Sequence, residues 1–545
     1  MTISVSVKHG GKKYELELDI TKPPTVFKQQ IHRLTAVEPS KQKILIKGGQ
    51  LKDDSDWKEL SIKPGHQFML IGTPGELPPP PSKLTVFMED MSEVQLAEAD
   101  PFPAGLVNMG NTCYLNSTVQ LLRSIPELQK NLNQYNGSSS DALRKDSALA
   151  SSLRDTYKDL IKSSESYSPF DLIRTLRSYA PQFAQQTQGH FSQQDAEECW
   201  VQILTAIRST LDNSTGINEK FVEQYMTGEI TTETKCIEVP EETPTISKER
   251  FLELKCNISI STNHMITGIQ DGLQQPLEKN SPTLGRSAQY MQTSKISRLP
   301  SYLTVHMVRF YWRRDINKKT KIMRKVKFPF SLDLVELLTE DLKKRVSEPA
   351  SRIKEIEKDR RERIKTQKKK KIALEASSKD AKEPTTGGSI KNDESKPKED
   401  HGDVPMAVDS QEDESEEDES AIREREAAIL MSLIDPDLAK DTGTNPTAQY
   451  ELCGIVTHKG ASADGGHYMA WVRCDLAKSN PNLPTSPNAE QKTNKPLDFQ
   501  DPDEQEWYKF DDEKVSIVKR EKILSLDGGG EDSTAYILLY KSMTL

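Results

Sequence analysis

The sequence predicts an α+β protein built from two folded parts. Near the N-terminus, apolar residues alternate as they do in strands, on either side of one short helix pattern. From residue 104 onward, a block of helical patterns precedes a block of strand patterns, an order typical of α+β folds. At 545 residues the chain is also too long for a single hydrophobic core. We therefore expect a small N-terminal domain and a larger second unit.

Residues 1–74 have the pattern of a small sheet with one helix. Two alternating strands flank a Gly10-Gly11 turn, a helix pattern follows, and two further strands are expected at 43–47 and 67–71. The apolar positions that define the hairpin and the helix are Ile3, Val5, Val7, Tyr14, Leu16, Leu18, Phe27, Ile31 and Leu34. This order of elements resembles a ubiquitin-like β-grasp domain. A proline run at 78–81 follows instead of a terminal Gly-Gly, which favours a docking module over a conjugated modifier.

Changes in composition divide the rest of the chain. The expected parts are the ubiquitin-like domain at 1–74, a linker at 75–103, a second folded unit formed by 104–345 and 446–545, and a charged insertion at 346–445. The insertion holds seven acidic residues between 411 and 420 and few apolar ones, so we expect it to be largely disordered. Helical patterns nevertheless occur at 351–371, where the residues are charged all round, and at 421–434. A shorter insertion is expected at about 475–505, between two neighbouring strands.

Composition also restricts the partners and cofactors. The net charge of −9 argues against nucleic acid or an anionic membrane and favours a protein partner that is neutral or basic. The N-terminus lacks a signal-peptide pattern, and no run of 18 apolar residues occurs, so we expect a soluble protein of the cytoplasm and nucleus. The six cysteines form no C-x-x-C pair. Cys236 and Cys256 lack a second pair at zinc-binding spacing, so we expect no metal and no cofactor.

The stretch from 105 to 123 predicts a glycine-containing loop that turns into a helix at Cys113. Asn111 or Thr112 can cap this helix, and apolar residues then recur at helical spacing. At a helix N-terminus, free N–H groups and the macrodipole favour a thiolate, which is a nucleophile. Taken alone, the stretch still favours the commoner alternative of a buried, inert cysteine.

A cysteine nucleophile needs a base, and the best candidate is His467. Gly465 and Gly466 precede it and reduce steric bulk, while the alternating residues after it indicate a strand that holds the ring. His306 is the main rival, but it lies inside the apolar run 302–310 and is expected to have a packing role. The histidines at 190 and 458 are expected in loops or at the surface.

The base in turn needs an acceptor for its second ring nitrogen. Asp511 and Asp512 follow the strand expected after His467, and either carboxylate can serve; a pair that only caps a turn is the alternative. Asn108, five residues before Cys113, can donate an amide N–H to a tetrahedral oxyanion. Removal of one such donor typically lowers the rate about 10²- to 10³-fold.

Three ordered motifs now identify a family resemblance. They are Gly105-Leu-Val-Asn-Met-Gly-Asn-Thr-Cys-Tyr-Leu-Asn-Ser, Gln193-Gln-Asp-Ala-Glu-Glu, and Gly466-His-Tyr followed by Trp507-Tyr-Lys-Phe-Asp-Asp. The first resembles the cysteine box of the ubiquitin-specific proteases, and the last resembles their histidine box. Together they cover roughly 104–345 and 446–545. The paired cysteines that carry zinc in the fingers of many family members are missing here.

The resemblance implies a papain-like fold divided into fingers, palm and thumb. It implies that the C-terminal tail of ubiquitin threads between Cys113, the nucleophile, and His467, the base. Asp511 would then orient the base, and Asn108 would bind the oxyanion. The residues expected to contact the tail are Gln194, Asp195, Gly466 and Tyr468. An acidic Asp195 suits the basic tail of ubiquitin.

The ubiquitin-like domain and the stretch Lys295-Ile-Ser-Arg-Leu-Pro-Ser-Tyr-Leu-Thr-Val-His-Met-Val-Arg-Phe resemble a proteasome-associated branch of this family. The resemblance implies ubiquitin and ubiquitinated proteins as substrates, the 26S proteasome regulatory particle as partner, and a monomer. It also suggests that loops at 312–322 and 458–466 lie over the cleft and are displaced when the enzyme docks. A non-catalytic scaffold that senses ubiquitin, and specificity for another ubiquitin-like tail, remain as alternatives.

Overall fold

The structure is a computed structural model, and it divides into two compact units, Met1–Asp90 and Met91–Leu545. The residues that it describes are 2–72 apart from 36, 47–48, 54, 58–59 and 61; 103–135; 144–211 apart from 164; 220–380 apart from 315–317; 419–478 apart from 463–464; and 505–543. Nearly all of the predicted linker at 75–103 and much of the two predicted insertions therefore lie outside the described residues. Among the helices of the described part, none is long and apolar enough to cross a membrane.

In its described residues, the N-terminal unit is a five-stranded sheet with one α-helix. Its elements are β1 (Thr2–His9), β2 (Lys12–Asp19), α1 (Pro24–Thr35), the 3-10 turn η1 (Pro39–Lys41), β3 (Lys43–Ile46), β4 (Gly49–Gln50) and β5 (Gln67–Ile71). The strand order is β2-β1-β5-β3-β4, with β1 parallel to β5 at the centre. Gly10 and Gly11 adopt positive φ, which closes the β1–β2 hairpin. The predicted ubiquitin-like arrangement is confirmed.

The core of this unit lies between α1 and one face of the sheet. Phe27 and Ile31 of α1 are at most 2% exposed, and they pack with Val7, Ile44 and Phe68 of the strands. One predicted core position is wrong: Leu34 is 48% exposed. Val37, which follows the end of α1, is fully buried in this core instead.

The second unit contains most of the strands. They are β6 (Gln186–Thr187), β7 (His190–Phe191), β8 (Gly228–Cys236), β9 (Thr245–Phe251), β10 (Glu253–Asn257), β11 (Gln274–Asn280), β12 (Ser287–Arg298), β13 (Tyr302–Val308), β14 (Phe310–Arg313), β15 (Lys318–Lys321), β16 (Ser331–Asp333), β17 (Gln449–Ser462), β18 (Gly465–Arg473), β19 (Glu506–Asp511), β20 (Lys514–Lys519) and β21 (Thr534–Ser542). Strand β8 follows a π-helical turn formed by Val222–Met226.

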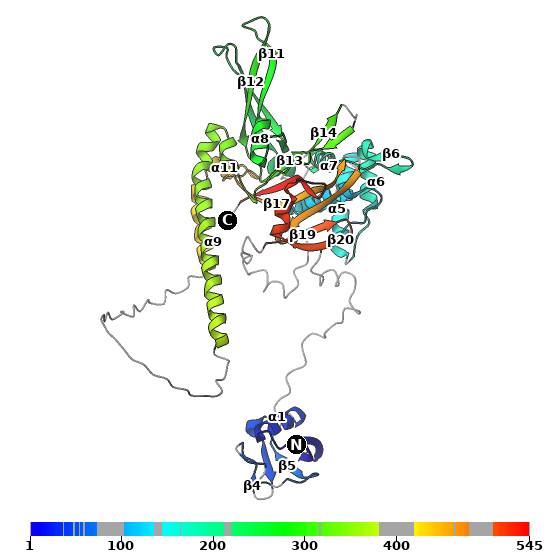
Figure 1. The fold of residues 1–545 in the computed structure, drawn as a ribbon, viewed down its shortest axis with the longest axis vertical. Coiled ribbons are helices and arrows are strands. Elements are labelled where there is room, and N and C mark those ends of the chain that lie inside the picture. The colour runs from blue at the N-terminus through cyan, green and yellow to red at the C-terminus, as the bar shows by residue number, and fades with distance from the viewer. Residues whose placement is uncertain are drawn as a thin grey trace, which may run out of the picture. The chain divides into compact units, whose positions relative to one another are not determined.

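These strands form one large sheet and one projecting sheet. The large sheet has the order β10-β13-β21-β17-β18-β19-β20, with β14, β15 and β16 joined at its side. The projecting sheet has the order β11-β12-β8-β9, and Figure 1 shows β11 and β12 as a long hairpin that extends away from the large sheet. β18 and β19 are antiparallel neighbours, as predicted, even though residues 479–504 between them are not described.

Helices cover both faces of the large sheet. The helices of the second unit are α3 (Cys113–Arg123), α4 (Pro126–Gln134), α5 (Lys145–Lys162), α6 (Phe170–Tyr179), α7 (Ala196–Leu211), α8 (Met265–Leu273), α9 (Glu340–Asp380), α10 (Glu419–Leu433), α11 (Pro436–Lys440), α12 (Cys474–Lys478) and α14 (Arg520–Leu524). Helices α3 to α7 share one hydrophobic core with the sheet, and α8, the start of α9 and α14 share the other. The helical layer, the large sheet and the projecting sheet correspond to the expected thumb, palm and fingers.

The predicted disorder of 346–445 is wrong at both ends of that segment. Helix α9 runs along one side of the second unit (Figure 1), and four of its residues at helical spacing are at most 2% exposed. These residues are Val346, Ala350, Ile353 and Ile356. α10 packs on α9, where Arg360 and Arg363 donate to Glu426 at 2.6 and 2.8 Å. The many charged residues around this narrow apolar face led to the prediction of disorder. Residues 381–418 lie outside the described part.

Candidate active site

Helix α3 places Cys113 at the junction of the thumb and the palm. Leu115, Val119 and Leu122 are fully buried, which confirms the predicted helix and fixes it against β18 and α7. The predicted side-chain cap is wrong, because neither Asn111 nor Thr112 caps α3 with its side chain. Thr112 instead accepts a hydrogen bond from the backbone N–H of Met109.

The thiol of Cys113 is 2% exposed and receives two N–H groups. The side-chain amide of Gln193 donates to Sγ at 3.2 Å, and the backbone N–H of Tyr468 approaches it at 3.4 Å. Both contacts stabilise negative charge on sulfur. Gln193 was not among the predicted site residues, although it opens the 193–198 motif, because sequence alone does not tell which of two adjacent glutamines faces the thiol.

His467 lies on β18, immediately before Tyr468, and its ring bridges the thiol and an acid. Its Nε2 lies 2.7 Å from Oδ1 of Asp511, at the end of β19. A hydrogen bond with Cys113, and then one with Asp511, outweigh the effect of burial and raise the pKa of His467 to about 9. Burial raises the pKa of Asp511, but hydrogen bonds from Lys509 and His467 outweigh it and leave a net lowered pKa.

Asp512 has different partners from Asp511. Its Oδ2 is 3.9 Å from Nε2 of His467, too far for a hydrogen bond. Its two oxygens accept from the amides of Asn116 and Asn108, each at 2.8 Å. Its backbone carbonyl accepts from Leu106 at 3.0 Å. The structure therefore brings Asp511 to the imidazole, while Asp512 ties the loop before Cys113 to the turn after β19.

Gly105 explains the close approach of these two segments. A Cβ at this position would lie 2.7 Å from the carbonyl oxygen of Asp512. Only glycine lets the loop run this close to the turn. Asn108 belongs to the same loop: Asp512 accepts one of its amide hydrogens, and its carbonyl accepts from the N–H groups of Gly110 and Thr112. The second amide hydrogen of Asn108 stays available to an oxyanion.

The predicted substrate residues lie close to this centre. Gln194 is half-buried, and Asp195 caps α7 by accepting from the N–H of Glu197 at 3.0 Å. Asp195 also accepts from the hydroxyl of Tyr536 at 2.7 Å. This buried tyrosine links α7 to β21, so Asp195 is held by two elements.

The identities of Gly466 and Tyr468 are each explained by contacts with neighbouring side chains. Gly466 has φ +134, and a Cβ there would lie 2.6 Å from Nε2 of His458, so a side chain is excluded by its own neighbours. Tyr468 is 1% exposed, and its ring packs against His458 at 4.8 Å and Tyr536 at 5.9 Å.

Three other histidines differ in how well they were predicted. His458 is wrong as a surface residue: it is fully buried on β17 beside Phe310 and Tyr468. Burial lowers its pKa to about 3, so its ring is neutral near pH 7. His306 is 9% exposed on β13 and packs edge-on against Tyr536, in line with a packing role. His190 is exposed on β7, as predicted.

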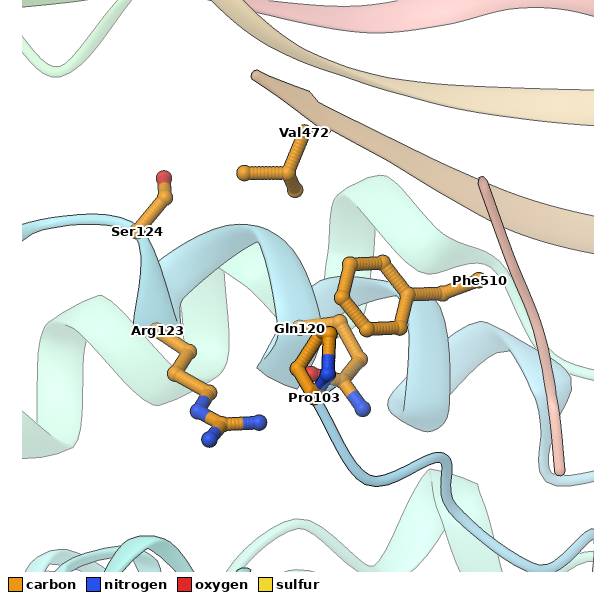
Figure 2. A pocket seen from close by; sticks show the side chains of 6 residues that line it. All are labelled: Pro103, Gln120, Arg123, Ser124, Val472 and Phe510. Carbon is orange, nitrogen blue, oxygen red and sulfur yellow. The ribbon is translucent and has the colours of Figure 1, made fainter. Parts of the chain in front are cut away.

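A small pocket lies at the other end of α3, away from Cys113. Figure 2 shows its lining residues, which are Pro103, Gln120, Arg123, Ser124, Val472 and Phe510. Val472 and Phe510 come from β18 and β19, whereas Gln120, Arg123 and Ser124 come from α3 and its end. The cavity of about 10 Å³ is about the size that one water needs, so it holds no substrate.

Comparison with known proteins agrees with this geometry. The family model described as ubiquitin carboxyl-terminal hydrolase matches residues 104–540, which is most of the chain. The chain belongs to this family. The model described as ubiquitin family matches residues 3–75, the N-terminal unit. As a member, the protein is a thiol-dependent ubiquitin carboxyl-terminal hydrolase.

Curated relatives of this hydrolase match it from end to end. Ubiquitin carboxyl-terminal hydrolase 6 of Schizosaccharomyces pombe is 39% identical, and the match covers 99% of each chain. Ubiquitin carboxyl-terminal hydrolase 7 of Arabidopsis thaliana is 36% identical over 99% of each chain. Ubiquitin carboxyl-terminal hydrolase 14 of Caenorhabditis elegans is 30% identical over 99% of this chain and 94% of its own. The two-unit organisation is therefore shared with these relatives.

Proposed function

We propose that this hydrolase cleaves the bond after the C-terminal glycine of ubiquitin on conjugates, with Cys113 as its nucleophile. One observation carries the assignment: Cys113 starts helix α3, and its thiol contacts Gln193, His467 and the N–H of Tyr468. The five other cysteines are buried as well. Burial raises the pKa of the Cys199 thiol, which makes that residue a poor nucleophile.

The reaction follows from these contacts. The thiolate attacks the carbonyl carbon of the terminal glycine, and the resulting oxyanion accepts N–H groups from the loop that contains Asn108. The C–N bond breaks as protonated His467 gives its proton to the leaving amine. A thioester on Cys113 remains. Neutral His467 then takes a proton from water, the hydroxide attacks the thioester, and the thiol leaves as thiolate. Asp511 stabilises the imidazolium at each proton transfer.

A ubiquitin with an electrophile in place of its terminal carboxylate tests this assignment. Such a probe should add one equivalent covalently to the full chain, and peptide mass spectrometry should locate the adduct on Cys113. Cys199→Ala is the matched control, because Cys199 is fully buried; labelling should be unchanged in that variant. An adduct that forms equally in Cys113→Ala would show that another residue is the nucleophile. Absence of any adduct in the unsubstituted protein would favour the non-catalytic scaffold.

We further propose that the N-terminal domain docks the enzyme on the proteasome regulatory particle. An apolar patch on its outer sheet face supports this: Leu45, Met69 and Ile71 are 40 to 52% exposed. Leu45 pairs with Met69 across β3 and β5, and Ile71 pairs with Lys43 in the same ladder. Exposed apolar clusters of this kind are typical of protein interaction sites. No other part of the described N-terminal unit combines three such exposed side chains on adjacent strands.

We also propose that docking relieves a block of the cleft. Hairpin β14–β15 lies beside the β17–β18 turn, to which it is fixed by buried Lys321. Nζ of Lys321 donates to the carbonyl oxygens of His458 at 2.7 Å and Gly460 at 3.1 Å. Burial, and then the charge of Arg309, lower the pKa of this lysine to about 8, so it is still largely protonated at pH 7 but loses its charge at a lower pH than an ordinary lysine. A partner that moves the hairpin would have to break this contact.

The patch predicts a specific docking defect. Leu45→Asp places a charge in the patch and should reduce co-sedimentation with purified proteasome at least tenfold, since buried unpaired charge is costly at interfaces. Hydrolysis of a fluorogenic ubiquitin substrate without proteasome should be unchanged, whereas stimulation by added proteasome should be lost. Glu17→Ala, an exposed change on β2, is the control. Wild-type stimulation by proteasome in Leu45→Asp would contradict docking through this patch.

A further inference from the structure

We propose that Glu197, Glu253 and His306 bind a divalent transition-metal ion of the zinc class. The three side chains come from different elements: Glu197 from the first turn of α7, Glu253 from β10 and His306 from β13. Their candidate ligand atoms all lie within 4.8 Å of one another. One imidazole nitrogen and two carboxylate oxygens form a donor set that zinc accepts in proteins.

The environment of His306 indicates that this residue binds a ligand from outside the protein. His306 is 9% exposed, and its Nδ1 has no hydrogen-bond partner among the described residues. The nearest acceptor, Oε1 of Glu253, lies 3.6 Å away, beyond hydrogen-bond distance. A buried ring nitrogen without a partner is costly, and a metal ion bound to its lone pair removes that cost.

The carboxylates of Glu197 and Glu253 also have few positively charged neighbours. The side chain of Glu253 is 12% exposed, and its Oε2 has no partner among the described residues. Besides His306, a basic residue near it is Lys255, an exposed residue with Nζ 3.7 Å from Oε1. Two half-buried carboxylates beside one imidazole therefore form a site in which a dication compensates negative charge.

The ligand atoms of the three side chains must move only slightly closer together to bind one zinc ion. Ligands about 2.0 to 2.2 Å from a tetrahedral zinc ion lie roughly 3.4 Å from one another. A spacing of up to 4.8 Å must therefore shrink by up to about 1.4 Å, and rotation of the glutamate side chains has to supply this because the backbones of β10 and β13 are fixed in one parallel ladder. Three protein ligands leave one position for water. Imidazole in the set selects against Mg²⁺ and Ca²⁺, which prefer oxygen ligands alone.

The ion would connect α7 to the palm sheet. Glu197 lies two residues after Asp195, whose carboxylate caps α7 and accepts from Tyr536. The ring of Tyr536 in turn contacts His306. A bound ion therefore braces the helix start that carries Asp195. The site is separate from the hydrolysis assigned above.

Zinc binding to the full chain tests the site. We use Cys113→Ala throughout, so that the reactive thiol contributes no ligand, and titrate with ZnCl₂ by calorimetry. One equivalent should bind, and Tm should rise by about 3 °C when zinc is about 100 times Kd. Adding Glu253→Gln or Glu197→Gln should abolish this binding and the shift in Tm. Glu249→Gln, an exposed change on β9, is the matched control and should retain both.

Cobalt provides a second readout that does not depend on stability. Co²⁺ in place of Zn²⁺ should give the visible absorption of a tetrahedral or five-coordinate site, without the charge-transfer band of a thiolate ligand. Should a glutamate variant fail to fold, His306→Gln supplies the same comparison. Zinc binding that persists unchanged in Glu253→Gln and Glu197→Gln would overturn the assignment. So would absence of binding together with a raised KM for ubiquitin substrate in these variants, because the cluster would then receive a basic side chain of the substrate.

Discussion

His467→Gln is expected to lower kcat/KM for a fluorogenic ubiquitin substrate by at least about 10⁴-fold, since loss of the base of a catalytic triad can cost up to about 10⁶-fold. Glutamine can keep a hydrogen bond to Asp511, but it cannot accept a proton near pH 7. The thiol then loses the group that deprotonates it, and the leaving amine loses its proton donor. Initial rates at several substrate concentrations measure the effect, which should fall on kcat more than on KM.

His190→Gln is the matched control for that experiment. It makes the same change in an exposed residue of β7, and its kcat/KM should stay within about twofold of the unsubstituted enzyme. Circular dichroism and Tm should agree among the three proteins, because His467 is half-buried and does not belong to either large hydrophobic core. If His467→Gln kept more than a tenth of the activity, a different residue would have to serve as the base.

The sequence was sufficient for the elements that carry Cys113 and His467. Helical spacing after Cys113 and strand alternation after His467 depend on local contacts, and the structure confirms both elements. The neighbouring strands β18 and β19 were also predicted, because each combines buried aromatic residues with strand alternation. Local patterns of this kind do not depend on which distant segment a residue meets.

The hydrogen-bond partners of Asp511 and Asp512 could not be predicted from such local patterns. Asn108 and Asp512 are 404 positions apart, and their contact depends on the glycine at 105 and on the backbone of the turn after β19. Two adjacent aspartates have the same local signal, so only the fold separates them: Asp511 faces the imidazole and Asp512 faces the amides. Gln193 and Gln194 pose the same problem, and the structure turns Gln193 toward the thiol.

Highly charged helices are a second case in which sequence composition gives the wrong prediction. Helix α9 is polar on average, and composition predicts disorder over much of it. A narrow stripe of buried apolar residues between Leu342 and Ile356 is enough to fix it against the rest of the unit. Salt bridges of Glu426 with Arg360 and Arg363 then join α10 to it. Mean composition misses such a stripe because it averages over all faces of the helix.

Asp511→Asn is expected to move the basic limb of the pH profile to lower pH and to reduce kcat/KM at pH 7.5 by about 10²- to 10⁴-fold. The carboxylate of Asp511 accepts from His467 and helps to raise its pKa to about 9, so the imidazolium persists up to that pH in the unsubstituted enzyme. An amide lacks the negative charge that stabilises the imidazolium. The ring therefore loses its proton at lower pH, and less of the thiolate–imidazolium pair exists near neutrality.

Asp512→Asn separates this electrostatic role from a structural one. The side chain of Asp512 accepts from Asn108 and Asn116, and its charge makes only a small contribution to the pKa of His467, so its replacement should loosen the loop before Cys113 and move the basic limb less than Asp511→Asn does. We expect a smaller loss, about tenfold, with the limb still near pH 9. Profiles of kcat/KM from pH 5 to about 10 compare the two variants directly. A limb that shifts in Asp512→Asn and stays in Asp511→Asn would exchange the two assignments, because the acid hydrogen-bonded to the imidazole should affect its pKa more than an acid 3.9 Å away.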